Sequence, residues 1–81
     1  MNAKDKLLSN IDKVHTTPMG VARISRNLLL RDADVVDHCK KIIANNECKV
    51  SIRGKNYYCE YDGVRITINI HSYTIITAHK K

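Results

Sequence analysis

Apolar residues recur at helical spacing in the first half of the chain and at alternate positions in the second half. An apolar helical face in residues 3–14 is formed by Leu7, Leu8, Ile11 and Val14. Asn2 can cap the start of this segment through its side-chain oxygen. The pattern therefore predicts a first helix over residues 3–14.

Two further helices are predicted from caps and apolar stripes. Thr17 can cap a second helix, and Pro18 suits its first position, where a missing N–H costs nothing. Asp32 or Asp34 can cap a third helix that ends near Asn45. The stripes are Val21, Ile24 and Leu28 in the second helix and Val35, Val36, Cys39, Ile42 and Ile43 in the third. Helices are thus expected over residues 3–45.

A four-stranded antiparallel meander is predicted over residues 48–79, where the apolar period becomes two. Two-residue turns at Gly54-Lys55 and Asp62-Gly63 join its first three strands. One face then collects Cys48, Val50, Ile52, Tyr57, Cys59, Tyr61, Val64, Ile66 and Ile68, and the other Lys49, Ser51, Arg53, Asn56, Tyr58, Glu60, Arg65, Thr67 and Asn69. A slip of one residue would mix the two sets, so the register is well specified.

The last strand has two possible faces. An even-length loop at His71-Ser72 turns Tyr73, Ile75 and Thr77 to the core, whereas an odd-length loop turns Thr74, Ile76 and Ala78 there. Helices followed by such a meander indicate an α+β domain, with about three helices packed on one face of the sheet. The 81 residues are enough for one domain, residues 1–81.

Net charge points to an anionic partner. Lys and Arg number 14 against 8 acidic residues, which gives a charge of +6 and favours nucleic acid or an acidic protein. No apolar run is long enough to span a membrane, and the N-terminal residues resemble no signal segment. Three cysteines without C-x-x-C spacing predict buried thiols, no metal site and a cytoplasmic location.

Histidines are the candidates for proton transfer. Cleavage of RNA without a metal needs a base for the 2′-hydroxyl, an acid for the leaving oxygen and cations for the phosphate. Histidine suits both proton tasks. We expect a catalytic group formed by His15, His71, His79, Thr74 and Thr77. Surface or hydrogen-bonded structural histidines would give the same pattern.

Nucleic-acid contacts are expected from basic and aromatic side chains on exposed faces. The candidates are Arg23, Arg53, Tyr58, Arg65 and Lys80. Tyr58 could stack on an unpaired base, or it could be an ordinary cross-strand packing residue. No phosphate-binding loop, dinucleotide-binding turn or zinc-protease motif occurs in the chain. We expect no cofactor.

The chain resembles a family of small uncharacterised bacterial and phage proteins, the DUF3781 family. The resemblance rests on His15-Thr16-Thr17, Gly20, Arg23-Ile24, Asn27-Leu28, Gly54-Lys55-Asn56, Tyr58, Ile66-Thr67-Ile68-Asn69 and the run from Ser72 to Lys80. The family has no assigned activity, so the resemblance supplies no catalytic residues. Its order of elements is similar to that of barnase-type, colicin-type and RelE-type endoribonuclease toxins, a fold-level analogy.

Two hypotheses follow from the sequence. The first is a small, toxin-like, metal-independent endoribonuclease acting on RNA in preference to DNA, with a protein antitoxin as a possible partner. The second is a non-catalytic protein that binds nucleic acid or a ribonucleoprotein, or a phage-derived inhibitor such as an anti-CRISPR.

Overall fold

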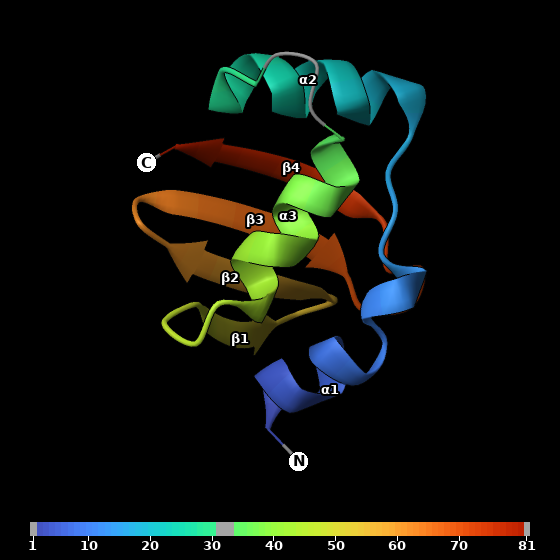
Figure 1. The fold of residues 1–81 in the computed structure, drawn as a ribbon. Helices are drawn as coiled ribbons and strands as arrows, with labels where there is room; N and C mark the ends of the chain where they lie inside the picture. The colour runs from blue at the N-terminus through green and yellow to red at the C-terminus, as the bar shows by residue number, and fades with distance from the viewer. Residues whose placement is uncertain (1, 31–33, 81) are drawn as a thin grey trace.

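Helices precede an antiparallel sheet in the computed structural model, which describes residues 2–30 and 34–80. The elements are α1 (Ala3–Ser9), the 3₁₀ turn η1 (Ile11–Lys13), α2 (Pro18–Leu28), α3 (Val35–Ala44), β1 (Lys49–Arg53), β2 (Asn56–Tyr61), β3 (Val64–Asn69) and β4 (Ile75–Lys80). The four strands pair in the order β1-β2-β3-β4. The predicted α+β class is therefore confirmed (Figure 1).

The first helix is shorter than its apolar pattern predicts. Helix α1 ends at Ser9, and a 3₁₀ turn covers Ile11–Lys13. The Ser9 hydroxyl donates to the Asp5 carbonyl, and the Asn10 side chain donates to the Lys6 carbonyl. Side chains of this kind compete with the backbone for helix hydrogen bonds. The predicted helix over residues 3–14 is thus wrong in its second half.

Helix α2 covers the outer edge of β4 and ties the N-terminal half of the chain to the sheet. Thr17 caps α2 through a hydrogen bond from the Gly20 N–H, as predicted. The Thr16 hydroxyl donates to the Ile75 carbonyl, and the Asn27 side chain donates to the Ala78 carbonyl. These bonds satisfy carbonyl groups that an edge strand would otherwise leave without partners.

Gly20 is required by the close approach of Thr16 to α2. A β-carbon added at Gly20 would overlap the Thr16 hydroxyl. The hydroxyl is held by its bond to Ile75, so a larger residue would disturb the tie between α2 and β4. The contact explains why a buried glycine lies in the first turn of a helix, where alanine would otherwise be more favourable.

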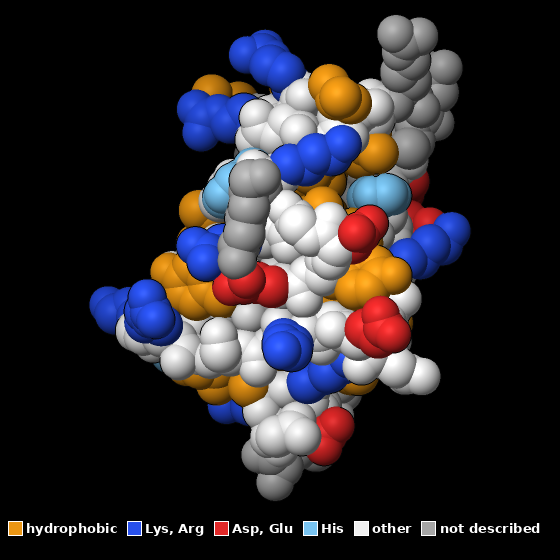
Figure 2. Space-filling view, turned by 90° about the vertical axis from the view of Figure 1, so that its left-hand side faces the viewer, with side chains coloured by type: hydrophobic (Ala, Val, Ile, Leu, Met, Phe, Trp, Pro, Cys, Tyr) orange, Lys and Arg blue, Asp and Glu red, His pale blue; other side chains and the backbone are white. Residues whose placement is uncertain are grey.

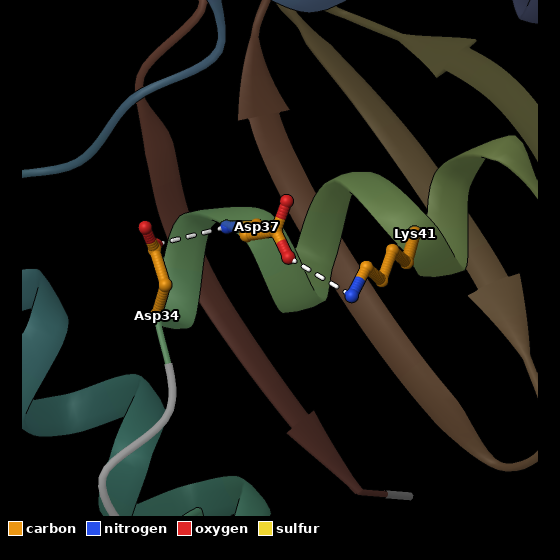
Figure 3. A network of polar contacts seen from close by, with 3 residues as sticks. All are labelled: Asp34, Asp37 and Lys41. Carbon is orange, nitrogen blue, oxygen red and sulfur yellow. Dashed lines mark hydrogen bonds and ion pairs between the residues drawn. The ribbon is translucent and has the colours of Figure 1, made fainter.

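Helix α3 begins at a side-chain cap. Asp34 accepts a hydrogen bond from the Asp37 N–H, and Asp37 forms an ion pair with Lys41 one turn later (Figure 3). The alternative cap, Asp32, lies outside the described residues. The helix ends at Ala44, one residue before the predicted end at Asn45.

Both predicted hairpin turns are present. Arg53 pairs with Asn56 across Gly54-Lys55, and Tyr61 pairs with Val64 across Asp62-Gly63. Gly54, Asp62 and Gly63 have positive φ values of 61°, 50° and 77°. These conformations match the tight turns that follow the twist of antiparallel strands. The predicted register is confirmed for the residues of β1, β2 and β3, although Ile52, which was expected on the core face, is 46% exposed at the edge of the sheet.

Strand β4 combines the two alternatives left open by the sequence. Ile68 pairs with Ile75, but Thr67 pairs with Thr77, so Ile76 is an extra residue that forms a bulge. Ile75 is buried before the bulge and Ala78 after it. The even-length loop therefore predicts the residues before the bulge correctly, and the odd-length loop predicts those after it.

The core lies between the helices and one face of the sheet. Figure 1 shows α3 crossing that face, with α1 near β1 and α2 beside β4. The fully buried side chains of the core include Leu7, Ile24, Cys39, Ile43, Tyr57, Cys59, Ile66 and Ile68. Within the described residues, the helices leave the opposite face of the sheet uncovered, and we call it the open face.

Replacing Asp34 with Ala is expected to destabilise the protein by about 1 kcal/mol, because α3 loses its N-cap bond. Lys41→Ala is the matched control. It removes an ion pair whose side chains are 78% and 55% exposed, so we expect a loss of no more than a few tenths of a kcal/mol. Urea unfolding of both variants measures the difference. Equal losses would contradict the assigned cap.

Candidate functional site

One row of charged residues crosses the whole open face. Lys49 lies opposite Glu60, Glu60 opposite Arg65, and Arg65 opposite His79 in the strand register. Directly opposite residues in antiparallel strands project to the same side and have Cα atoms about 4.5–5.5 Å apart. The charged row, as we name these four residues, therefore holds an acid, an imidazole and two cations on adjacent strands.

Arg65 is the best-defined member of the charged row. One of its terminal nitrogens, Nη2, lies 3.1 Å from Glu60 Oε1, and the two side chains are 40% and 38% exposed. Its guanidinium carbon lies 6.0 Å from the centroid of the Tyr58 ring. The buried Nε has no hydrogen-bond partner among the described residues. Arg65 is thus positioned by two neighbours while a donor remains unused.

A second row runs parallel to the charged row and contains uncharged hydrogen-bonding groups. Ser51 pairs with Tyr58, Tyr58 with Thr67, and Thr67 with Thr77. A small hollow of about 170 Å³ lies between the rows and is lined by Ser51, Arg53, Tyr58, Glu60 and Arg65. The hollow brings together an aromatic ring and two guanidinium groups.

A larger hollow lies beside the charged row, next to the Asp62-Gly63 turn between β2 and β3. Its volume is about 370 Å³, and it is lined by Glu47, Lys49, Glu60 and residues 61–64. Glu60 therefore lines both hollows. Figure 2 views the molecule from the side on which β4 ends, and Lys and Arg side chains gather toward the upper and left parts of this view. The charged row thus borders two hollows, one beside Tyr58 and Arg53 and one beside the Asp62-Gly63 turn.

His15 forms a separate polar cluster at the other end of β4. Its backbone bridges β4, with the His15 N–H donating to the Tyr73 carbonyl and the Ile75 N–H donating to the His15 carbonyl. Its ring nitrogen Nε2 lies 3.2 Å from Thr74 Oγ1. Thr74 Oγ1 lies 2.8 Å from the Ser72 hydroxyl. The structure therefore brings together His15 and Thr74, two of the candidate residues.

The structure separates His15 from His79. His15 is paired with Thr74, whereas His79 is five residues further along the same strand. At about 3.3 Å per residue, the two positions are roughly 15 Å apart. The expectation that the two imidazoles share one site is therefore wrong, because His15 pairs with Thr74 at the start of β4 whereas His79 lies near the end of that strand.

A family model for proteins of unknown function, DUF3781, matches residues 8–79. The chain belongs to the DUF3781 family. No curated protein and no solved structure matches it, so the similarity to ribonuclease toxins stays a prediction. The description of the DUF3781 family assigns no activity to its members.

The remaining predicted residues of this DUF3781 protein are spread over several surfaces. Arg53 is exposed at the end of β1, and His71 is exposed in the turn before β4. Arg23 is exposed one helical turn before Asn27, on the side of α2 that borders β4. Lys80 pairs with Val64, so alternation turns it away from the face that carries His79.

Sequence reasoning missed two members of the charged row. The predicted register already paired Glu60 with Arg65 and Lys49 with Glu60, but neither Lys49 nor Glu60 was assigned to a site. The missing information was the register of β4. Once the bulge at Ile76 is included, His79 falls opposite Arg65 and completes the row.

The cysteines of the DUF3781 protein are all free and buried, as predicted. Burial raises the pKa of Cys39 to about 11. A hydrogen bond from the Cys59 thiol, assisted by the nearby Lys4 ammonium, lowers the pKa of Cys48 to about 7, while the pKa of Cys59 is raised. Cys48 is only 3% exposed, so its thiol is closed to most reagents.

Residues 2–30 and 34–80 contain no group of three or more His, Cys, Asp or Glu side chains arranged to hold a metal ion. None of the helices in these residues combines the length and apolar character needed to cross a membrane.

A double-mutant cycle tests the contact between Glu60 and Arg65 in solution. Glu60→Gln and Arg65→Gln should show a coupling energy of roughly 0.2–1 kcal/mol in urea unfolding, a range typical of half-exposed ion pairs. Combining Arg65→Gln with Asp12→Asn in η1 provides the control, for which we expect additive effects. Equal coupling in both cycles would contradict the assigned pairing.

Proposed function

We propose that this protein is a metal-independent endoribonuclease whose active site is the charged row. One observation carries the proposal. Glu60, Arg65 and His79 are directly opposite one another on three adjacent strands of the open face. A carboxylate, a guanidinium and an imidazole are the three kinds of group that RNA cleavage needs for proton removal, charge stabilisation and proton donation.

Glu60 serves as the general base in this mechanism. Its carboxylate takes the proton of the ribose 2′-hydroxyl, and the resulting oxygen attacks the adjacent phosphorus. The side chain is 38% exposed and accepts a hydrogen bond from Arg65 at 3.1 Å. This bond orients the carboxylate while leaving it accessible to substrate.

His79 serves as the general acid. Its imidazolium donates a proton to the 5′-oxygen that leaves the phosphorus. Attacking and leaving oxygens lie on opposite sides of a phosphorus in an in-line displacement. Glu60 and His79 lie two strands apart, which corresponds to roughly 10 Å between their backbones. This spacing leaves room for a phosphodiester between the two side chains.

Arg65 and Lys49 stabilise the negative charge of the transition state. Arg65 lies between the base and the acid, where its guanidinium can donate to the non-bridging phosphate oxygens. Lys49 adds a second positive charge next to Glu60. The four residues together can perform the complete reaction through proton transfer and electrostatic stabilisation.

Tyr58 provides a surface for a nucleobase next to the cleaved bond. The ring lies in the row that neighbours the charged row and lines the 170 Å³ hollow with Ser51 and Arg53. A base stacked on an aromatic ring contributes about 1–3 kcal/mol in single-stranded nucleic acids. The substrate is therefore unpaired RNA, because a base held in a duplex cannot lie flat on the sheet.

Cleavage of labelled single-stranded RNA in EDTA tests the proposal. Wild type should give products that end in a 2′,3′-cyclic phosphate, because the 2′-oxygen is the nucleophile. Glu60→Gln and His79→Gln should each reduce the rate by about 10²-fold or more, the usual contribution of a general acid or base. RNA carrying a single 2′-deoxynucleotide should resist cleavage at that position.

Asp12→Asn and His38→Gln are the matched controls, since Asp12 is exposed in η1 and His38 lies on α3. Both variants should cleave at the wild-type rate. Circular dichroism verifies that every variant is folded. Wild type that leaves RNA intact in EDTA, or a double Glu60/His79 variant that cleaves like wild type, would rule out this active site.

A second candidate function is binding of single-stranded nucleic acid without cleavage. The observation that favours it is the position of Arg65 over the Tyr58 ring, at 6.0 Å from its centroid. Such a pair forms a flat cationic surface on which a base can stack. Binding would use the same open face and would need neither Glu60 nor His79.

Salt dependence and charge reversal distinguish this second function. Affinity for RNA should fall steeply with salt, because binding releases the counterions of each neutralised phosphate. Arg53→Glu with Arg65→Glu should abolish binding, whereas His79→Gln should leave it unchanged. Tight binding by wild type without cleavage products selects this function over the nuclease, and binding that ignores the two arginines removes it.

A further inference from the structure

The His15 imidazole is fully engaged by protein groups. Its Nδ1 lies 2.8 Å from the Lys13 carbonyl oxygen, and its Nε2 lies 3.2 Å from Thr74 Oγ1. A bound phosphate or ribose would have to displace one of these partners. His15 is therefore poorly suited to contact RNA directly, and the group on which it can act is the Thr74 hydroxyl.

The contact with Lys13 determines how the imidazole bonds to Thr74. A carbonyl oxygen only accepts hydrogen bonds, so the Nδ1 of His15 must be the donor. In the neutral ring the proton is then on Nδ1, and Nε2 has a free lone pair. Thr74 can then donate its hydroxyl proton to Nε2, provided that the Ser72 hydroxyl donates to Thr74 Oγ1 at 2.8 Å in place of Asn69 Oδ1 at 3.2 Å. This is the arrangement of a hydroxyl nucleophile, a general base and a group that orients the base.

A strained turn holds the hydroxyl in place. Tyr73, directly before Thr74, has a φ of 58°, a left-handed conformation that is unusual for a non-glycine residue. The Asn69 side-chain oxygen accepts from the N–H groups of His71 and Ser72 at 2.9 Å each. The Ser72 hydroxyl then lies 2.8 Å from Thr74 Oγ1. The turn therefore fixes Thr74 from both sides.

We propose that Thr74 is a nucleophile activated by His15, and that it accepts a phosphoryl group from small donors with a good leaving group. The site is distinct from the charged row, because Thr74 directly precedes β4 and lies five residues before His79. The proposal does not depend on ribonuclease activity.

The reaction balances with groups that are present. Thr74 Oγ1 forms a bond to phosphorus as the bond between phosphorus and the leaving oxygen breaks, and the leaving group departs with that electron pair. The hydroxyl proton moves to His15 Nε2 and passes from there to solvent. The Lys13 carbonyl keeps its bond to Nδ1 and stabilises the imidazolium that forms.

Lys13 selects a phosphoryl donor over a neutral electrophile. Its ammonium nitrogen lies 5.8 Å from the centroid of the Tyr73 ring. Tyr73 is the residue directly before Thr74. A cation at this place attracts an anionic donor and stabilises charge on its phosphoryl oxygens. The turn is open to such a donor, because His15 and Ser72 are exposed.

Incubation with acetyl phosphate tests the proposal. Mass spectrometry should find one phosphoryl group on Thr74 of wild type, in an acid-stable ester, with acetate released. Thr74→Ser should still be modified, because it keeps a hydroxyl, and Thr74→Val should lose the modification. His15→Gln should slow it by at least tenfold, while His38→Gln should react like wild type.

Three results would overturn the proposal. One is an acid-labile phosphoryl group on His15, which would make the imidazole the acceptor. Another is modification of Thr77 at the same rate as Thr74, which would show ordinary hydroxyl reactivity. The third is wild type that stays unmodified while thermal unfolding shows it to be folded. Thermal unfolding of Thr74→Val and Thr74→Ser verifies that loss of reaction reflects chemistry.

Discussion

The register of β1, β2 and β3 is the constraint on which the proposed site depends. It is set by the two tight turns, in which Gly54, Asp62 and Gly63 adopt positive φ. A shift of one residue at either turn would carry every side chain of a strand to the opposite face. Buried Cys59 and Ile66 would then be exposed, and Glu60 and Arg65 would enter the core. The energy that holds the apolar face together therefore also aligns the charged residues.

The N-terminal half of the chain acts on the site through β4. Thr16 and Asn27 bond to carbonyl groups of this strand, and His15 pairs with its first residues. The bulge at Ile76 lets the strand bury Ile75 and Ala78 while it turns His79 toward Arg65. Without the bulge, strict alternation would turn Ile75 and Ala78 to opposite faces of the sheet, so only one of them could be buried in the core. The helices thus shape the open face although they do not cover it.

Local patterns were enough to predict the hairpins, the cap at Thr17 and the polarity of the two sheet faces, and they narrowed the cap of α3 to Asp32 or Asp34. These features depend on neighbours in sequence, such as the Asp62-Gly63 turn between two alternating runs. The bulge in β4 depends on packing against distant residues, which no pattern within the segment contains. The early end of α1 follows side-chain hydrogen bonds of Ser9 and Asn10, which the apolar period does not reflect. The sequence listed Thr74 and His15 as candidates, and the structure places them in contact. Glu60 was not assigned to a site because the position of His79 opposite Arg65 could not be predicted.

An NMR titration with a 2′-deoxy dinucleotide, which cannot be cleaved by the proposed mechanism, tests the central claim most directly. The account predicts that the largest backbone shifts fall on Lys49, Glu60, Arg65 and His79, with smaller shifts at Tyr58. The phosphate resonance should also move, because Arg65 donates to it. Shifts confined to the helices, or to the turn around His71, would contradict the claim that the charged row binds a phosphodiester.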